Sequence, residues 1–133
     1  MTPELEQQLR SKYPVLFLNN PEISIGDGWY QLLDNLCGTI SHHVQYAYPE
    51  ELQGQVVIGQ LKEKFAGLRA YFDHTDDFCN GVIAMAEVQS FYICEECGNK
   101  GKLTNIGNWL LTLCQEDEAK ARTELEQRYK GSK

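Results

Sequence analysis

Residues 94–118 read CEECGNKGKLTNIGNWLLTLCQEDE, and the spacing of the cysteines in this stretch implies a metal site. Cys94 and Cys97 form a C-x-x-C-G motif, whose glycine permits the tight turn that aims backbone N–H groups at both sulfurs. Cys114 and Asp117 lie three residues apart at the start of an expected helix, so their side chains share one face. Zinc takes cysteine and carboxylate ligands tetrahedrally, and structural sites use four protein ligands. We therefore predict that Cys94, Cys97, Cys114 and Asp117 bind Zn²⁺.

The same stretch predicts a zinc knuckle, a hairpin and a helix, in that order. Residues 102–106 and 109–113 flank Gly107-Asn108, and glycine in the first position of a two-residue turn suits type II′. Residues 114–129 are expected to be helical, because acidic side chains in the first turn and basic ones in the last complement the helix dipole. This order of elements is similar to that of a treble-clef zinc finger.

The fourth ligand has alternatives. Aspartate is rarer than cysteine or histidine in structural zinc sites, so Glu116, Glu118 and His74 compete with Asp117 for this role. The three cysteines also fit a fold that has lost its metal, or a catalytic zinc whose fourth position holds water. A thioredoxin-like redox pair is disfavoured, because the C-x-x-C motif does not stand between a strand and a long helix.

Residues 1–92 are expected to form a body of helices packed on a β-hairpin, and residues 93–133 the metal-binding module of the same compact α+β unit. The clearest helix of the body opens at residues 26–28, with Asp27 as its N-cap. Apolar side chains recur along this helix at a helical spacing, which indicates one buried stripe. The stripe consists of Trp29, Leu32, Leu33, Leu36, Cys37, Ile40 and Val44.

The body hairpin is predicted from residues 56–62 and 68–72, which are rich in β-branched and aromatic side chains. The turn between them contains Gly67, which is free to adopt a positive φ. A further helix is expected over residues 78–91. Candidates for its N-cap are Thr75, Asp76 and Asp77, and its expected inward side chains are Phe78, Val82, Met85 and Ala86.

The composition is that of a globular, water-soluble domain. The chain has 133 residues, of which 42% are hydrophobic, and this suffices for one domain with its own core. The sequence contains no run of 18 apolar residues, and its first ten residues lack the features of a signal peptide. Five cysteines, two of them in C-x-x-C-G, fit a reducing compartment better than a disulfide framework. We therefore expect a cytoplasmic protein with no membrane contact.

The net charge of −7 is distributed unevenly along the chain. Residues 1–93 hold 5 basic and 12 acidic side chains, whereas residues 94–133 hold 7 of each. An acidic body repels the phosphate backbone, so nucleic-acid binding is disfavoured. A basic protein partner fits this body better, although an acidic charge alone also serves solubility.

One basic cluster interrupts the acidic body. Lys62, Lys64 and Arg69 are the only lysines and arginines in residues 13–99, and they surround the expected hairpin turn beside Phe65. Such a cluster is a candidate contact for an anionic group or a protein partner. The alternative is that the charges only solvate the hairpin tip and protect an edge strand.

Three motifs are similar to those of a family of small, mostly uncharacterised bacterial, prophage and phage proteins. They are GDGWYQLLDNLC (residues 26–37), QLKEKFAGLRAYF (residues 60–72), and CEECG followed by WLLTLCQED. Members of that family often end the last motif in C-x-x-H, where this chain has Asp117. The resemblance implies a zinc-binding fold with position 117 as the fourth ligand, and it implies no activity.

Three functions are compatible with these patterns. The first is a non-catalytic interaction protein stabilised by zinc, which in a phage setting would act on a host factor as an inhibitor or adaptor. The second is a nucleic-acid-binding zinc finger that uses the basic residues of the module. The third is a metal-dependent hydrolase or nuclease built on Asp73 and His74 with Asp76 or Asp77, although DHTDD is more typical of a helix-capping turn. His42 and His43 have no partner identifiable from the sequence.

Overall fold

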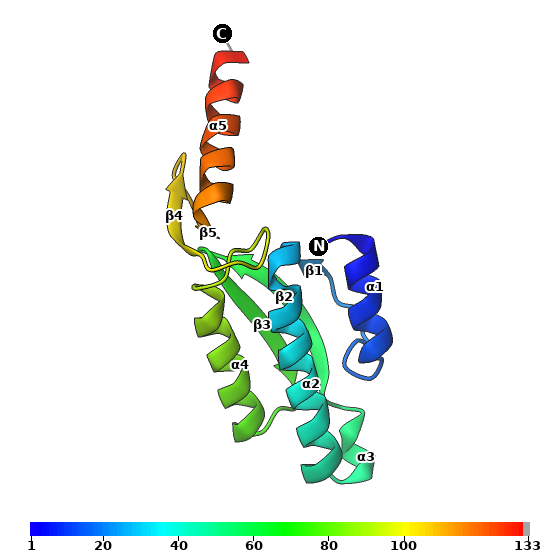
Figure 1. Ribbon diagram of the computed structural model, residues 1–133. Helices are drawn as coiled ribbons and strands as arrows, with labels where there is room; N and C mark the ends of the chain where they lie inside the picture. Colours follow the sequence, from blue (N-terminus) through cyan, green and yellow to red (C-terminus); the bar gives the residue numbers. More distant parts are fainter. Residues whose placement is uncertain (132–133) are drawn as a thin grey trace.

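The residues that the structure describes fold into an α+β arrangement with five α-helices and two small sheets (Figure 1). The computed structural model describes residues 1–131. Within them, no helix combines the length and the apolar character needed to cross a membrane. The elements in chain order are α1 (Pro3–Lys12), β1 (Ile23–Ser24), the 3₁₀ turn η1 (Asp27–Trp29), α2 (Tyr30–Ala47), α3 (Glu50–Gln53), β2 (Val57–Lys64), β3 (Gly67–Asp73), α4 (Asp77–Ser90), β4 (Lys102–Ile106), β5 (Trp109–Leu113) and α5 (Gln115–Gly131).

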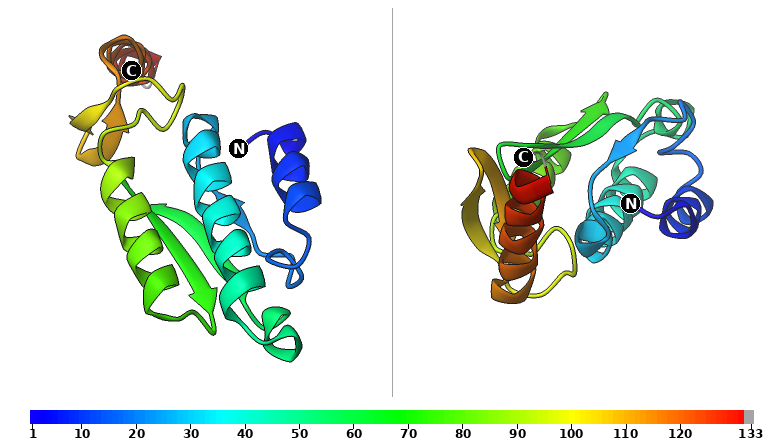
Figure 2. Two further views of the ribbon diagram at one scale, coloured as in Figure 1. Left: turned by 60° about the horizontal axis from the view of Figure 1, so that its bottom comes forward. Right: turned by 90° about the horizontal axis from the view of Figure 1, so that it is seen from above.

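The larger sheet has the strand order β1-β2-β3 and carries the predicted body hairpin. β1 runs parallel to β2, and β2 pairs antiparallel with β3 in a register that places Leu61 opposite Ala70. Helices α2 and α4 lie side by side on one face of this sheet, and α1 lies beside α2 (Figure 2). The second sheet, β4-β5, and helix α5 stand at one end of the body, and α5 extends away from it (Figure 1).

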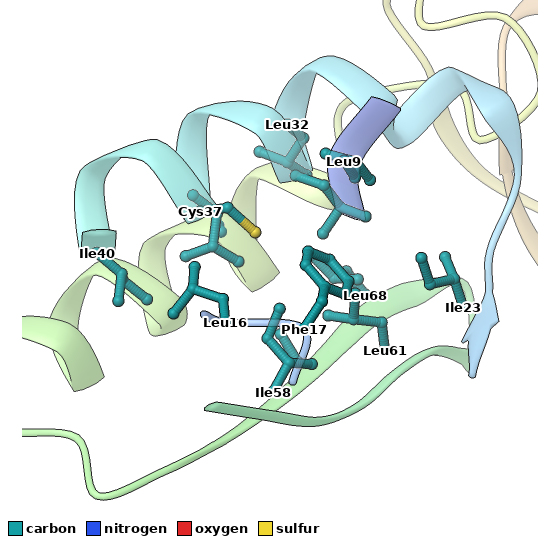
Figure 3. Close-up of a cluster of buried hydrophobic side chains, with 14 of the residues drawn as sticks. Leu9, Leu16, Phe17, Ile23, Leu32, Cys37, Ile40, Ile58, Leu61 and Leu68 are labelled. Atoms are coloured by element: carbon teal, nitrogen blue, oxygen red, sulfur yellow. The ribbon is translucent and has the colours of Figure 1, made fainter. Parts of the chain in front are cut away.

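The main core lies between α2 and the larger sheet (Figure 3). All seven residues of the expected stripe from Trp29 to Val44 are buried, so this prediction is confirmed. Leu16 and Phe17 fill the core from the α1–β1 connection, and the Ile58 N–H donates to the Leu16 carbonyl over 2.8 Å. The burial of these apolar side chains is the main stabilising contribution to the body.

The start of α2 differs from the expectation. Gly26, and not Asp27, precedes the 3₁₀ turn, and the Asp27 carboxylate accepts from the Thr2 N–H over 2.8 Å. The capping role of Asp27 was wrong because a contact distant in sequence engages its side chain. Gly28 is required by close packing, since a Cβ there would lie 2.1 Å from the Cys94 carbonyl oxygen. The motif GDGW therefore serves to bring the start of α2 against residues 94–98.

The turn of the body hairpin also differs from the expectation. Phe65 and Ala66 hold positive φ values of 51° and 74°, which is the pattern of a type I′ turn. Gly67 does not hold a positive φ, and instead a Cβ there would lie 2.4 Å from the Phe91 ring. The glycine is needed for packing against the end of α4.

Helix α4 is rotated relative to the expected orientation. The Asp76 carboxylate accepts from the Cys79 N–H over 2.9 Å, which confirms one of the expected caps. Phe78 and Met85 were expected to face inward, but they are 49% and 59% exposed, whereas Val82 is half-buried and Ala86 buried. Hydrogen bonds from β3 set this orientation. The Leu68 N–H donates to Ser90 Oγ, and the Ala70 N–H donates to a Glu87 carboxylate oxygen, so these two residues of α4 face the strand. These bonds cap the edge of the sheet and fix the face that α4 presents.

The second hairpin forms as predicted, except for its turn. Gly107 and Asn108 both hold positive φ values, 57° and 69°, so the turn is type I′ and the predicted type II′ was wrong. The helix that follows runs from Gln115 to Gly131, and none of these residues is buried.

Candidate metal centre

The knuckle presents its two cysteines from a hydrogen-bonded turn. The Gly98 N–H donates to the Cys94 carbonyl over 2.9 Å, and the Cys94 N–H donates to the Asn99 carbonyl over 2.7 Å. Cys94 is fully buried, whereas Cys97 is exposed. Backbone bonds therefore hold both sulfurs on one side of the turn.

The other two donor side chains come from the junction of β5 and α5. Cys114 immediately follows β5, and Asp117 lies in the first turn of α5. The Asp117 N–H points at the Cys114 sulfur over 3.4 Å, and the Glu118 N–H donates to the Cys114 carbonyl over 2.9 Å. The positive end of the helix dipole thus faces a thiol and a carboxylate, as the sequence predicts.

The four donors lie at the spacing of a tetrahedral site. Asp117 Oδ2 is 3.2 Å from the Cys94 sulfur and 3.3 Å from the Cys114 sulfur. The Cys97 and Cys114 sulfurs are 3.7 Å apart, and all four ligand atoms fall within 4.8 Å of one another. A tetrahedral zinc ion separates two sulfur ligands by about 3.8 Å and a sulfur from an oxygen by about 3.6 Å. The donor set therefore fits a metal ion with little rearrangement.

The other candidates for the fourth position lie elsewhere. Glu116 and Glu118 pair along the surface of α5, with Lys120 at 3.7 Å and with Arg122 at 3.4 Å. His74 belongs to the β3–α4 loop, which lies at the opposite end of the body from the knuckle (Figure 1). Only Asp117 among the four is close to the three sulfurs.

The electrostatics of the cluster favour a cation. Hydrogen bonds donated by the thiols, that of Cys94 first, lower the pKa of Asp117 below its usual range. Burial is the main cause that raises the pKa of Cys94. Three thiols therefore crowd one carboxylate, and a divalent cation would replace their protons because coordination deprotonates a thiol outright. All five cysteines of the chain carry free thiols.

Glu95, inside the C-x-x-C motif, binds the cluster to the body, and sequence reasoning missed this role. Its carbonyl accepts from the Gly28 N–H over 2.7 Å, and its carboxylate accepts from the Gly26 N–H over 2.9 Å. Burial raises the pKa of Glu95. Next to it, the Trp29 indole N–H donates to the Ile93 carbonyl over 2.8 Å. The start of α2 and the knuckle are therefore locked together.

A second link joins the two hairpins. Thr112 on β5 is fully buried, and its hydroxyl donates to the Ala66 carbonyl over 2.7 Å. This bond places the tip of the β2–β3 hairpin against the β4–β5 sheet. Phe65 and Trp109, which are 67% and 64% exposed, flank a cleft of about 420 Å³ at this junction.

The basic residues that the sequence singles out lie on the β2–β3 hairpin. Lys62 and Arg69 are paired across the two strands. The Lys62 ammonium lies 5.7 Å from the Tyr71 ring, and the Lys64 ammonium lies 5.7 Å from the Phe65 ring. Arg69 also approaches Glu87 at 3.9 Å. We call Lys62, Lys64, Phe65 and Arg69 the hairpin surface.

In the DHTDD turn, Asp76 has partners outside the turn. The Asp76 carboxylate contacts His43 at 2.7 Å and caps α4, and the side chains grouped with it are His43 and Cys79. His43 therefore has a partner that was not identifiable from the sequence, because 33 residues separate the two. The His43 ring also stacks on Phe78, with ring centroids 4.1 Å apart.

The donor chemistry of Cys94, Cys97, Cys114 and Asp117 is the observation that indicates a metal site in this chain. Thiolates and a carboxylate suit divalent zinc, whereas calcium and magnesium prefer oxygen ligands alone. Comparisons of the chain with protein-family models, with curated proteins and with solved structures found no match.

Proposed function

We propose that this protein is a non-catalytic, zinc-stabilised interaction protein that docks a protein partner on the hairpin surface. The observation that carries the proposal is the junction of the two hairpins, where the exposed Phe65 and Trp109 line a cleft together with Lys64. The resemblance of three sequence motifs to those of phage and prophage proteins supports a phage setting, with a host protein as the partner.

Zinc is the ion that suits the metal centre best. Three sulfurs and one carboxylate oxygen close a four-coordinate site without a position for water, which is the arrangement of structural zinc. A knuckle, a hairpin and a helix supply these ligands in order, and this supports a treble-clef assignment for residues 93–133. The ion in this proposal holds the module in shape and performs no chemistry.

The hairpin surface has the composition of an interaction site. Aromatic side chains and arginine are enriched among residues that dominate binding energy at protein interfaces. Here Phe65 and Trp109 line one cleft with Lys64, and Arg69 lies farther along β3, on a chain whose body is otherwise acidic. The basic cluster favours a partner that presents acidic side chains around an apolar centre.

Paired charge reversals test this proposal in the native cell. Tagged wild-type chain is expected to copurify with a protein that the Lys62→Glu, Arg69→Glu double variant fails to retain. The matched control is Lys100→Glu with Lys102→Glu, which makes the same change in charge outside the hairpin surface. Equal recovery of the partner with both double variants would contradict the proposed surface. Salt-sensitive binding of nucleic acid by the wild type, lost in the Lys100→Glu, Lys102→Glu variant, would favour the nucleic-acid alternative, which uses the basic residues of the module.

A further inference from the structure

A second cluster of metal-ligating side chains lies at the end of the body opposite the knuckle (Figure 1). His43 belongs to the last turns of α2, Asp76 is the N-cap of α4, and Cys79 lies in the first turn of α4. His43 Nε2 is 2.7 Å from Asp76 Oδ2, and the three ligand atoms lie within 4.8 Å of one another.

Helix capping and the hydrogen bond between His43 and Asp76 explain only part of this cluster. Asp76 Oδ1 caps the helix through the Cys79 N–H at 2.9 Å, which leaves Oδ2 to face His43. Neither contact requires a thiol, yet the Cys79 side chain is grouped with the other two donors and is fully buried. The spacing Asp76-x-x-Cys79 reverses that of Cys114-x-x-Asp117, and both pairs stand at a helix N-terminus.

Solvent and small ions reach the cluster from one side. The side chains of His43 and Asp76 are 21% and 39% exposed, and Asp76 lines a cleft of about 500 Å³ together with Tyr48 and His74. The His43 ring is held in place by Phe78 at 4.1 Å and by Tyr48 at 6.2 Å, measured between ring centroids. The imidazole is therefore positioned beside the carboxylate, and an ion need not enter through the core.

We propose that His43 Nε2, Asp76 Oδ2 and Cys79 Sγ bind a second zinc ion, with water from the cleft in the fourth position. On binding, the Cys79 thiol releases one proton, and the neutral imidazole carries its proton on Nδ1 so that Nε2 can donate its lone pair. One thiolate and one carboxylate then balance the charge of Zn²⁺. Three protein ligands with one open position is the pattern of zinc sites that bind an exogenous ligand.

The test is metal stoichiometry in the full chain, measured by native mass spectrometry after dialysis against zinc and then against buffer. Wild type is expected to retain two zinc ions. Asp76→Asn is expected to retain one, because asparagine caps a helix as well as aspartate does but lacks the anionic ligand. His43→Gln is expected to retain one as well. The control is His42→Gln, which changes the neighbouring ring outside the cluster and should retain two.

Cobalt substitution identifies the ligands independently of stoichiometry. The thiolate-to-cobalt absorption of the wild type should contain the contribution of four sulfurs, and Asp76→Asn should lose that of Cys79 while keeping the other three. One zinc ion in the wild type, or two in both Asp76→Asn and His43→Gln, would overturn the proposal. Loss of a zinc ion in His42→Gln would equally overturn it, since binding of the second ion would then depend on a side chain outside the three named ligands.

Discussion

The metal-ligating clusters at the two ends of the molecule share one local pattern and differ in what surrounds them. Each places a cysteine and an aspartate three residues apart at the start of a helix. Around Cys79, α4 packs on a core that includes Ile40 and Val44. Around Cys114, the buried apolar residues are Ile106 and Leu113 with Cys94, and α5 buries none of its own. We therefore expect the pattern to be an addition to a stable body in one place and, with a metal bound, the main support of the fold in the other.

This difference follows from the apolar area available to each region. A small hydrophobic cluster supplies little stabilisation, and folds of this size commonly need a metal or disulfide in its place. Residues 94–131 form one small cluster and one two-stranded sheet. We therefore expect loss of metal to unfold residues 94–131 and to leave the body folded.

The largest expected effect is that of Cys97→Ser. A structural zinc ion contributes about 10 kcal/mol to the folding of a small zinc domain, so the variant should lose the fold of residues 94–131. Hydrogen exchange followed by mass spectrometry should show protection lost in β4, β5 and the first turns of α5, while α2 and β2 remain protected. Protection of β4 and β5 at the wild-type level would show that the module folds without the ion.

A smaller effect is expected where the two regions touch, at Gly28. A Cβ at this position would lie 2.1 Å from a backbone oxygen of Cys94, so Gly28→Ala must push the knuckle away from α2. Overpacking of this kind costs about 3 kcal/mol, and the zinc affinity should fall with it. Urea unfolding and competition with a zinc chelator measure both quantities. Gly81→Ala is the matched control, because a Cβ at Gly81 meets no atom within 4 Å, and it should stabilise the protein by about 1 kcal/mol.

The smallest expected effect concerns the acid sensitivity of the body, at Asp34. The Tyr13 hydroxyl, which donates to this carboxylate, and the Lys12 ammonium at 2.9 Å lower the pKa of Asp34 below its ordinary value of 3.8. A lowered folded-state pKa stabilises the protein above pH 3.8, and this stabilisation is lost as the pH falls through the folded-state value.

Asp34→Asn should therefore cost about 1–2 kcal/mol near pH 6 and progressively less below pH 4. Urea midpoints should be measured across this pH range on metal-free protein, in which only the body is expected to be folded. Glu22→Gln, at an exposed carboxylate, serves as the control for the change from a carboxylate to an amide. A constant difference between Asp34→Asn and wild type would remove Asp34 from the acid response.

Much of the fold was predictable from residues that are close in sequence. The stripe from Trp29 to Val44 is read from its period, and the cap at Asp76 from its residue type, because both depend on neighbours within a few positions. The sequence also predicted that Asp117 lies beside the three cysteines of the cluster, since the C-x-x-C-G motif and the Cys114-x-x-Asp117 spacing are local. The identity of the ion stays a prediction.

The failures at α4 and at His43 share one cause, which is contact between distant segments. Phe78 and Met85 face solvent because Glu87 and Ser90 are drawn to the edge of β3, and no pattern within α4 encodes that edge. His43 finds Asp76 across 33 residues of chain. Such pairs form only when helices and sheet have packed.

In residues 94–118, the sequence alone predicted the three cysteines as one cluster and the order of knuckle, hairpin and helix, because these features depend on short local spacings. The tertiary structure decided where that module sits. Glu95 accepts from Gly26 across 69 residues, and Thr112 donates to Ala66 across 46, so the knuckle lies against the start of α2 and the second sheet against the tip of the β2–β3 hairpin. Backbone groups carry no sequence pattern of their own, and the partners of buried ones are set only by packing.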